Sequence, residues 1–358
     1  MDRLKYPILC INGGSSSIKA CLFDTDGQRH TMQYRFDGRP TEENYRQAFD
    51  KLGHDLMGKT PGITAHRFVH GGDVQESSRE LTSQERERLH SIVHLAPLHL
   101  PMNILGVELC AEKFPSRQIA CFDTAFHHNL PAISRVLPIP QKENMRRYGF
   151  HGLSYAYLSS KLEGLIGEKA RGRIILAHLG SGSSLCMINN LESIDTTMGY
   201  TPAGGVCMGT RPGDLDPGVM LELMQRYDAK ALSKLVNEEM GLLALSNGLS
   251  GNMEVLLASQ EPEAKFAVDY FCSGITSAIG SMAAKAGGIE AIVFSGGIGE
   301  NSSLIRSKIC APLAFLGVQL DSTANDLNHE QLAPESEIPV LRMRTDEEIM
   351  MKQLASLY

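Results

Sequence analysis

Two stretches of this sequence match each other and decide the fold. Residues 8–18 read ILCINGGSSSI, and residues 175–185 read ILAHLGSGSSL. Five of the eleven aligned positions are identical, and each copy places a strand pattern before a turn rich in Gly and Ser. A second apolar segment follows each turn, at 18–23 and 185–188, as in a β-hairpin with a small-residue tip. Because the copies lie about half a chain apart, we interpret them as an internal duplication.

The remaining pattern alternates strands with helices. Residues 291–301, AIVFSGGIGEN, predict a third strand that ends in glycines, and a helix over 302–310 follows with Ser302 and Ser303 as candidate caps. We expect further strands at 63–69 and 118–122, and helices at 83–93, 103–113, 154–165, 216–226, 265–286 and 343–357. This order indicates an α/β architecture. No long Pro- or Ser-rich linker separates the halves, which favours two lobes with a cleft.

Composition excludes several classes of protein. The net charge of −7 gives no support to nucleic-acid binding. No apolar run reaches the roughly 18 residues that a membrane span needs, and the N-terminus has no signal-peptide pattern. The eight cysteines form no C-x-x-C pair, which argues against a zinc site and fits a reducing compartment. We therefore expect a cytoplasmic protein that binds neither nucleic acid nor membrane.

The two Gly/Ser tips are candidate phosphate sites. Residues 13–17 and 180–184 offer backbone N–H groups without bulky side chains, together with hydroxyl donors, and Lys19 adds a positive charge. One such tip alone would be read as a tight turn. Two matched tips and the glycine turn near residue 297 favour phosphate binding. Neither tip is a Walker P-loop, because G-x-x-x-x-G-K-[ST] is absent.

The trio of strand–turn units resembles the actin, sugar-kinase and Hsp70 superfamily. A set of short blocks narrows the resemblance to the acetate kinase family. The blocks occur in the family's order and run nearly from end to end: 12–19, 66–72 (HRFVHGG), 95–99 (LAPLH), 122–127 (FDTAFH), 147–152 (RYGFHG), 178–180, 208–211 (MGTR) and 296–301. Each block alone is weak, but the ordered set is specific.

The resemblance implies a fold and an activity. The fold is α/β, with two duplicated lobes of the actin-like ATPase (ribonuclease H-like) type and a central nucleotide cleft. The N-terminal lobe would comprise residues 1–127 and 348–358, and residues 128–347 would carry most of the nucleotide site. The activity would be that of an acetate kinase, a reversible in-line transfer of phosphoryl from ATP to acetate that gives acetyl phosphate and ADP. The resemblance further implies Mg²⁺ or Mn²⁺ and a homodimer.

Phosphoryl transfer requires positioning and neutralisation of charge, so cationic side chains should converge on the transferred group. By resemblance, Arg67 and Arg211 hold the carboxylate and the phosphoryl group, and His151 donates a hydrogen bond to that group in the transition state. Asp123 ends an apolar stretch, where a carboxylate is costly unless it is used or paired. The family places it beside the phosphoryl group.

The resemblance assigns three further sets of residues. Asn12 and Glu347 would serve the metal, Glu347 through water. The pocket for the small acid maps to Val69, Leu98, Phe150 and Pro202. Nucleotide and phosphate contacts map to Ser15, Ser17, Lys19, His178, Gly180, Ser181, Gly182, Gly297, Ile298 and Asn301.

Four positions depart from the family pattern. Ser181 stands for an Asn, residues 252–254 (NME) replace an Asp-x-Arg segment, residues 202–205 read PAGG instead of PLEG, and Asp346 replaces an Asn. These changes affect the expected nucleotide affinity and the choice of phosphoryl donor more than the phosphoryl transfer itself. Propionate kinase, another acid kinase such as butyrate kinase, and a nucleotide-binding homologue with weakened catalysis therefore stay open as alternatives.

Overall fold

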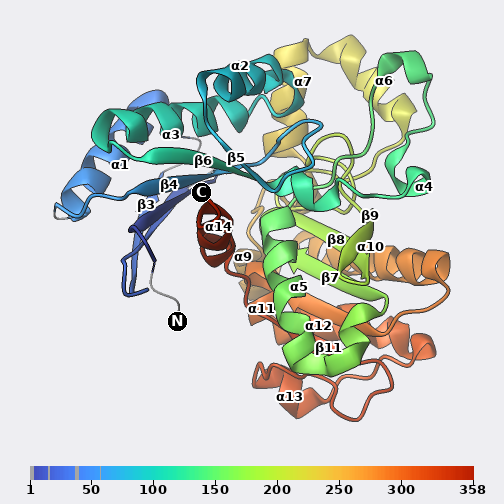
Figure 1. The fold of residues 1–358 in the computed structure, drawn as a ribbon. Helices are drawn as coiled ribbons and strands as arrows, with labels where there is room; N and C mark the ends of the chain where they lie inside the picture. The colour runs from blue at the N-terminus through green and yellow to red at the C-terminus, as the bar shows by residue number, and fades with distance from the viewer. Residues whose placement is uncertain (1–3, 15–16, 37–39, 57) are drawn as a thin grey trace. The chain divides into compact units, whose positions relative to one another are not determined.

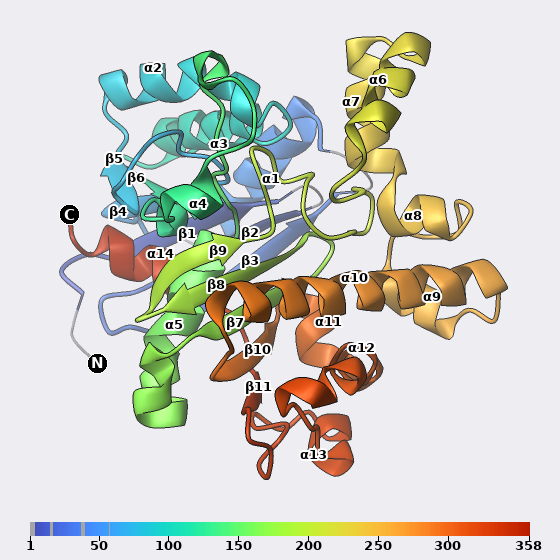
Figure 2. The same ribbon diagram turned by 90° about the vertical axis from the view of Figure 1, so that its right-hand side faces the viewer.

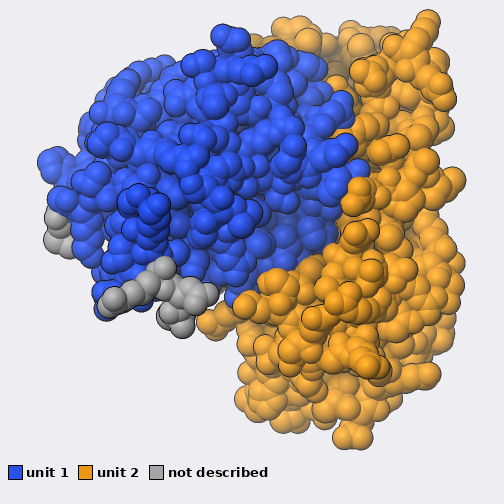
Figure 3. All heavy atoms as spheres, in the orientation of Figure 1, with its two compact units in different colours: residues 1–128, 150–157, 346–358 blue, residues 129–149, 158–345 orange. Residues whose placement is uncertain are grey.

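The computed structural model describes residues 4–14, 17–36, 40–56 and 58–358 (Figure 1). The chain forms two compact units, coloured separately in Figure 3. Unit 1 comprises residues 1–128, 150–157 and 346–358, and unit 2 comprises residues 129–149 and 158–345. Segment 150–157, which carries His151, thus groups with unit 1.

Unit 1 contains a six-stranded sheet with the order β3-β2-β1-β4-β6-β5. Strands β1, β2 and β3 form an antiparallel meander, β4 and β6 run parallel to β1, and β5 is antiparallel to β6. The strands are β1 (Ile8–Gly13), β2 (Ser17–Phe23), β3 (Arg29–Arg35), β4 (Ile63–Phe68), β5 (Ser78–Glu80) and β6 (Arg117–Phe122).

Unit 2 repeats this topology. Its sheet has the order β11-β10-β7-β8-β9, with an antiparallel meander β7-β8-β9 and two strands parallel to β7. The strands are β7 (Ile174–Leu179), β8 (Ser183–Asn189), β9 (Glu192–Thr196), β10 (Ala291–Ser295) and β11 (Val340–Arg342). Both predicted hairpins are present, as β1-β2 and β7-β8, so the duplicated α/β architecture is confirmed.

Helices cover both faces of the unit 1 sheet, because successive side chains of β1 point to opposite faces. Leu9 and Ile11 pack against α1 (Glu42–Asp55) and α3 (Leu100–Lys113), whereas Ile8 and Cys10 pack against α14 (Glu347–Ala355). Leu153, from the start of α5 (Gly152–Ile166), packs into the core between the sheet and α14. Helix α2 (Ser83–Ser91) lies beside α3.

In unit 2 the long helix α10 (Pro262–Ala286) packs along the sheet and contacts α9 (Met253–Ala258) and α12 (Ser303–Cys310) (Figure 2). Its buried residues, such as Phe271 and Ile275, face a core formed with β7 and β10. The other helices are α4 (Ala132–Arg135), α6 (Pro217–Arg226), α7 (Ala229–Lys234), α8 (Gly241–Leu245), α11 (Gly296–Asn301) and α13 (Ser322–Asp326).

The predicted helices are all found near their expected bounds, and Ser302 caps α12. The sequence did not predict the edge strands β3, β5, β9 and β11 or helix α1. All eight cysteines are free and buried. Among the described residues, no helix is long and apolar enough to cross a membrane.

We predict that buried histidines make unit 1 less stable in mild acid. Burial lowers the pKa of His127 to about 4, and its Nε2 lies 3.0 Å from the Phe150 carbonyl oxygen. The unfolded chain, with a His pKa near 6.5, binds the proton first. The free energy of unfolding should therefore fall as the pH drops from about 6.5 towards 4. Within this range the expected loss is about 1.4 kcal/mol for each pH unit.

Urea unfolding at pH 7.5 and 5.5 measures this loss. The variant His127→Gln should show a smaller difference between the two pH values than the unmodified chain. His90→Gln, at an exposed position of α2, is the matched control. An equal pH dependence in the His127 variant would refute the assignment.

Candidate active site

The centre of unit 1 is an ion pair between two neighbouring parallel strands. Arg67 lies near the carboxyl end of β4, and Asp123 follows β6 directly. Arg67 Nη2 and Nε lie 2.7 and 3.0 Å from Asp123 Oδ2. Asp123 is 0% exposed, and its Oδ1 has no hydrogen-bond partner among the described residues. The pair is buried, with one carboxylate oxygen left for another group.

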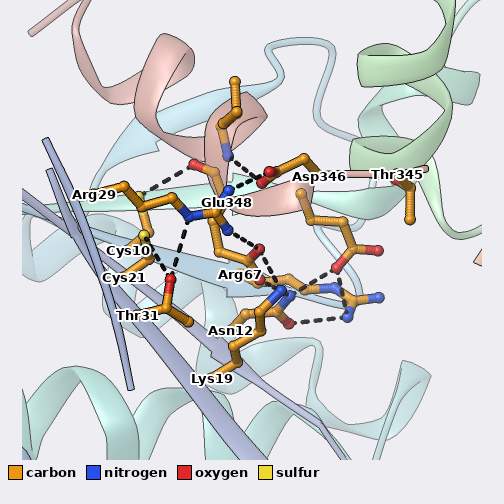
Figure 4. A network of polar contacts seen from close by, with 12 residues as sticks. Cys10, Asn12, Lys19, Cys21, Arg29, Thr31, Arg67, Thr345, Asp346 and Glu348 are labelled. Atoms are coloured by element: carbon orange, nitrogen blue, oxygen red, sulfur yellow. Dashed lines mark hydrogen bonds and ion pairs between the residues drawn. The ribbon is translucent and has the colours of Figure 1, made fainter. Parts of the chain in front are cut away.

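Two further predicted residues complete this network (Figure 4). Asn12, on β1, accepts a hydrogen bond from Arg67 Nη1 at 3.0 Å and donates from Nδ2 to Glu347 Oε2 at 2.8 Å. Glu347 also lies 3.1 Å from Arg67 Nη1. Asn12, Arg67, Asp123 and Glu347, predicted from separate blocks of the sequence, are therefore brought together.

The side chains of this network are largely buried, so their charges shift one another's pKa values. Burial raises the pKa of Asp123 to about 6, and Glu347 adds to the rise, while Arg67 opposes it. The carboxylates raise the pKa of Arg67 above its usual value, against the effect of burial. Arg67 therefore stays charged.

His151 stands beside Asp123 in a strained backbone conformation. Its φ is 59°, a left-handed value that is uncommon outside glycine. The next residue, Gly152, approaches the Asp123 backbone so closely that a Cβ would lie 1.9 Å from the Asp123 carbonyl oxygen. Such strain often marks functional sites. The Gly152 contact fixes the backbone of His151 beside the end of β6.

The first hairpin tip is only partly described. Ser15 lies outside the described residues, and Ser17 begins β2. Lys19 Nζ lies 2.7 Å from Glu348 Oε2, and the Lys19 side chain is 41% exposed. The predicted phosphate cation is thus held by a carboxylate at the rim of the network.

Three of the four predicted acid-pocket residues belong to unit 1. Val69 and Phe150 are buried, and Leu98 is half-buried. The ring of Phe150 meets His70 edge-on, with 5.5 Å between the ring centroids. Pro202 belongs to unit 2, where its carbonyl oxygen accepts a hydrogen bond from Arg211.

In unit 2 the predicted phosphate segments meet backbone to backbone. A Cβ on Gly180 would lie 3.9 Å from the Gly297 nitrogen and 4.0 Å from His178 Nε2. The Gly209 N–H donates to the Ser181 carbonyl at 3.2 Å, and a Cβ on Gly209 would lie 2.8 Å from the Gly251 carbonyl oxygen. Glycine is required at residues 209 and 251, because a Cβ on either would push their backbones apart.

Arg211 adds a positive charge to this centre. Its Nη1 donates to the Pro202 carbonyl at 2.6 Å, and it forms no ion pair with any carboxylate in the described part of the chain. Burial lowers the pKa of Arg211 to about 10. A half-buried arginine without a carboxylate partner suits an anionic ligand.

The remaining predicted residues lie on the turn after β7 and on α11. Gly182 is half-buried on the tip, Ile298 packs against the unit 2 core, and Asn301 Nδ2 donates to the Gly297 carbonyl at 2.8 Å. No Cβ contact within 4 Å limits Gly297, so its backbone is open. In the altered segment, Asn252 caps α9, Met253 is buried and Glu254 is exposed.

Sequence reasoning missed two arginines. Arg306 is fully buried on α12, where Nη1 donates to the Gly299 carbonyl at 2.8 Å and Nε donates to Asn325 Oδ1 at 2.8 Å, so it ties α11 to α13. Arg29 contacts the acidic start of α14. Helix α12 reads SLIRSKIC, with polar and apolar residues mixed, so no signal in the sequence indicated that Arg306 is buried.

A cavity of about 490 Å³ also lies in unit 2, against the small-residue face of α10. Asp195 and Lys285 line it and form an ion pair with 2.8 Å between Oδ2 and Nζ. None of the predicted site residues lines this cavity, so the chemistry of the candidate site lies elsewhere.

Comparison with known proteins identifies the family of this chain. Residues 46–353 match the model of the acetokinase family. An acetate kinase of Rhodopseudomonas palustris (strain TIE-1) is 43% identical over 96% of each chain, and one of Nitrobacter hamburgensis is 39% identical over 97% of this chain and 94% of its own.

Solved structures give the same result. A propionate kinase from Francisella tularensis superposes with a TM-score of 0.88 at 29% identity, and an acetate kinase from Porphyromonas gingivalis with 0.82 at 30%. Each comparison covers 98% of this chain and 99% of the other.

The duplicated lobes and these matches define the class of protein, a phosphotransferase with a carboxyl group as acceptor, built on the actin-like ATPase fold. Within this class, the chain belongs to the acetokinase family. The predictions of family, fold class and enzyme class are therefore confirmed. The roles of individual residues stay predictions.

We predict that Arg67 and Asp123 are strongly coupled in stability. Arg67→Gln leaves a buried carboxylate without its cation, so the free energy of unfolding should fall by about 3–5 kcal/mol. The double variant Arg67→Gln/Asp123→Asn removes that charge and should recover part of the loss. Urea unfolding of the two single variants and the double variant measures the coupling.

Arg46→Gln is the matched control, since Arg46 forms only an exposed pair with Glu42 on α1. It should leave the free energy of unfolding nearly unchanged. Additive losses in the double variant would show that the pair is not a coupled unit.

Proposed function

We propose that this chain catalyses the reversible transfer of a phosphoryl group between ATP and acetate, giving acetyl phosphate and ADP by direct in-line transfer. The observation that carries the proposal is Arg211, a half-buried guanidinium without a carboxylate partner in the described residues of unit 2, next to the glycine-lined backbone centre. An arginine in such a setting suits an anionic ligand.

Each unit would supply part of the chemistry. Arg67 and Arg211 would orient the carboxylate and neutralise the transferred phosphoryl group, and His151 would donate a hydrogen bond to it in the transition state. Asp123 would hold Arg67 in place and present its second oxygen to the reacting groups. The charge on the transferred group is spread over three oxygens, so fixed cations stabilise it without reorganisation.

Nucleotide contacts would come from the two tips and the α11 turn. The open backbone of Gly297 and the N–H groups near Gly180 suit phosphate oxygens, with Ser17, Lys19, His178, Ser181 and Gly182 as further donors. Ile298 and Asn301 would contact the nucleoside. The Gly296–Asn301 helix supports an adenine nucleotide over pyrophosphate as the donor.

A divalent metal fits the donor set of unit 1. The Asp123 oxygen without a partner, Glu347 and the Asn12 amide are oxygen donors, as Mg²⁺ prefers. No group of three or more His, Cys, Asp or Glu side chains that could hold a metal occurs in the described part of the chain. Mg²⁺ prefers oxygen ligands and usually keeps several of its waters, so it is the ion we propose here, with Mn²⁺ as a substitute. When bound, the metal would neutralise charge on the phosphate oxygens.

Propionate is the second candidate acceptor. The curated relatives are named acetate kinases, whereas the Francisella tularensis structure is titled a propionate kinase. Val69, Leu98, Phe150 and Pro202 are all apolar and would set the size of the acid. One methylene changes discrimination by only about 1–3 kcal/mol. We also propose a homodimer in the cytoplasm that binds neither nucleic acid nor membrane, from the family resemblance and the composition.

We predict acyl phosphate formation that depends on ATP and Mg²⁺, because the site offers cations for both the carboxylate and the phosphoryl group. Hydroxylamine trapping with acetate, propionate and butyrate, each with ATP, GTP or pyrophosphate, measures it. Acetate with ATP should give the highest kcat/KM. No hydroxamate from any acid would refute the kinase, and nucleotide binding by calorimetry without turnover would support a catalytically weakened homologue.

We further predict that Arg211→Ala lowers kcat/KM by about a thousandfold, because it removes the unpaired cation from the reacting groups. The circular dichroism spectrum should be unchanged. Arg226→Ala, an exposed arginine paired with Glu222 on α6, is the control in the same unit and should keep full activity. Near-normal turnover of the Arg211 variant would remove it from the site.

A further inference from the structure

Arg29 opens the edge strand β3 and uses all three guanidinium nitrogens. Nη1 pairs with Asp346 Oδ2, Nη2 lies 3.3 Å from Glu348 Oε2, and Nε lies 3.3 Å from Thr31 Oγ1 (Figure 4). Its Cζ also lies 5.8 Å from the centre of the Phe23 ring, on the neighbouring strand. Because each guanidinium nitrogen of Arg29 has a partner and the Phe23 ring lies close to the group, the orientation of the Arg29 side chain is well defined.

Glu348 is the member of this cluster that needs a cation. Its side chain is 2% exposed, so its charge is costly unless neighbouring groups compensate it. Three side chains do so: Lys19 at 2.7 Å, Asn12 at 3.0 Å and Arg29 at 3.3 Å. Lys19 is the more exposed of the two cations and is a candidate ligand for phosphate. Arg29 is therefore the cation committed to α14.

Glu348 reaches the reaction centre through Asn12. Asn12 Nδ2 donates to both Glu347 and Glu348, which leaves Oδ1 facing Arg67 Nη1 at 3.0 Å. A carboxylate oxygen accepts only, so the two glutamates fix which end of the amide faces Arg67. If Glu348 moved, Glu347 alone would hold the Asn12 amide, and the hold of Asn12 Oδ1 on Arg67 Nη1 would weaken.

The local charge count shows why a third cation is needed. Four carboxylates belong to this cluster, those of Asp123, Asp346, Glu347 and Glu348, against the three cations Lys19, Arg29 and Arg67. Without Arg29, three adjacent acids at the start of α14 would repel one another with only two cations nearby. Like charges in a partly buried cluster interact strongly.

We propose that Arg29 is a positioning residue for phosphoryl transfer, which holds Glu348 and Asp346 so that Asn12 orients Arg67. It does not contact the substrate itself. The inference rests on the proposed function, because Arg67 is there assigned to the carboxylate acceptor.

The test is Arg29→Gln, assayed as acyl hydroxamate formation with acetate and ATP varied in turn. A loosened Arg67 should raise the KM for acetate by about tenfold. The KM for ATP should rise much less, since most of the proposed nucleotide contacts come from unit 2 and only Lys19 among them pairs with Glu348. Arg29→Lys restores one charge without the fork and should recover the KM for acetate in part. If Arg29→Gln fails to fold, the lysine variant still tests the proposal by the same ratio of KM values.

Two further variants separate positioning from general stability. Arg46→Gln removes an exposed paired arginine of the same unit and should change neither KM value. Asp346→Asn, which keeps a side chain able to cap α14, should lower the KM for acetate again when it is combined with Arg29→Gln, because one of the repelling acids is gone.

Three outcomes decide the proposal. A selective rise in the KM for acetate, reduced by Asp346→Asn, supports it. An equal change in both KM values, or none, with an active unmodified chain overturns it. An inactive unmodified chain instead refutes the proposed function, so the two failures are distinguishable.

Discussion

The buried carboxylate of Asp123 is the constraint on which unit 1 depends. Five elements contribute to its surroundings: Asp123 follows β6 directly, β4 supplies Arg67, β1 supplies Asn12, α14 supplies Glu347, and Gly152 at the start of α5 packs against the Asp123 backbone. These segments are far apart in the sequence, and the last helix of the chain therefore packs against its first strand. An unpaired acid at this depth would cost several kcal/mol, so the elements are required to meet. Within the described residues, Asp123 Oδ1 is left buried without a hydrogen-bond partner.

Unit 2 builds its part of the site by a different physical means. Its segments meet through glycine backbones at residues 180, 209, 251 and 297, where a Cβ would contact a neighbouring backbone or fill the open tip. Backbone N–H groups and Arg211, which forms no ion pair with the described residues, then provide the positive potential, so that few side chains need to be ordered. Buried Arg306 supports this backbone by donating a hydrogen bond to the Gly299 carbonyl oxygen. Unit 1 thus contains a network of charged side chains, whereas unit 2 presents mainly backbone N–H groups.

The sequence predicted the parts of the fold that have strong local signals. The hairpins were found because apolar runs flank Gly/Ser turns, and α10 was found because it is long and rich in small apolar residues. Strand β3 was missed because its burial alternates between exposed and half-buried positions, so its residues carry no apolar run. Glu347 was placed by resemblance, but the roles of Arg29 and Glu348 depend on contacts between residues more than 300 positions apart, which no local pattern contains. The burial of Glu348 in particular follows from tertiary packing alone.

The duplication itself explains why the two units cannot carry equivalent sites. In the aligned hairpins Asn12 corresponds to Leu179, and His178 corresponds to Ile11. Because successive side chains of a strand point to opposite faces, the polar residues of the two copies lie on opposite faces of their sheets. Ile11 and Leu179 accordingly pack into hydrophobic cores, while Asn12 and His178 are half-buried. The polar residue lies one position earlier in the second copy than in the first. The side chain of Asn12 therefore faces α14 and its carboxylates, whereas the side chain of His178 faces away from α10. The repeat predicts the backbone of both lobes, and the side-chain alternation within it determines that one lobe organises charge while the other presents its backbone.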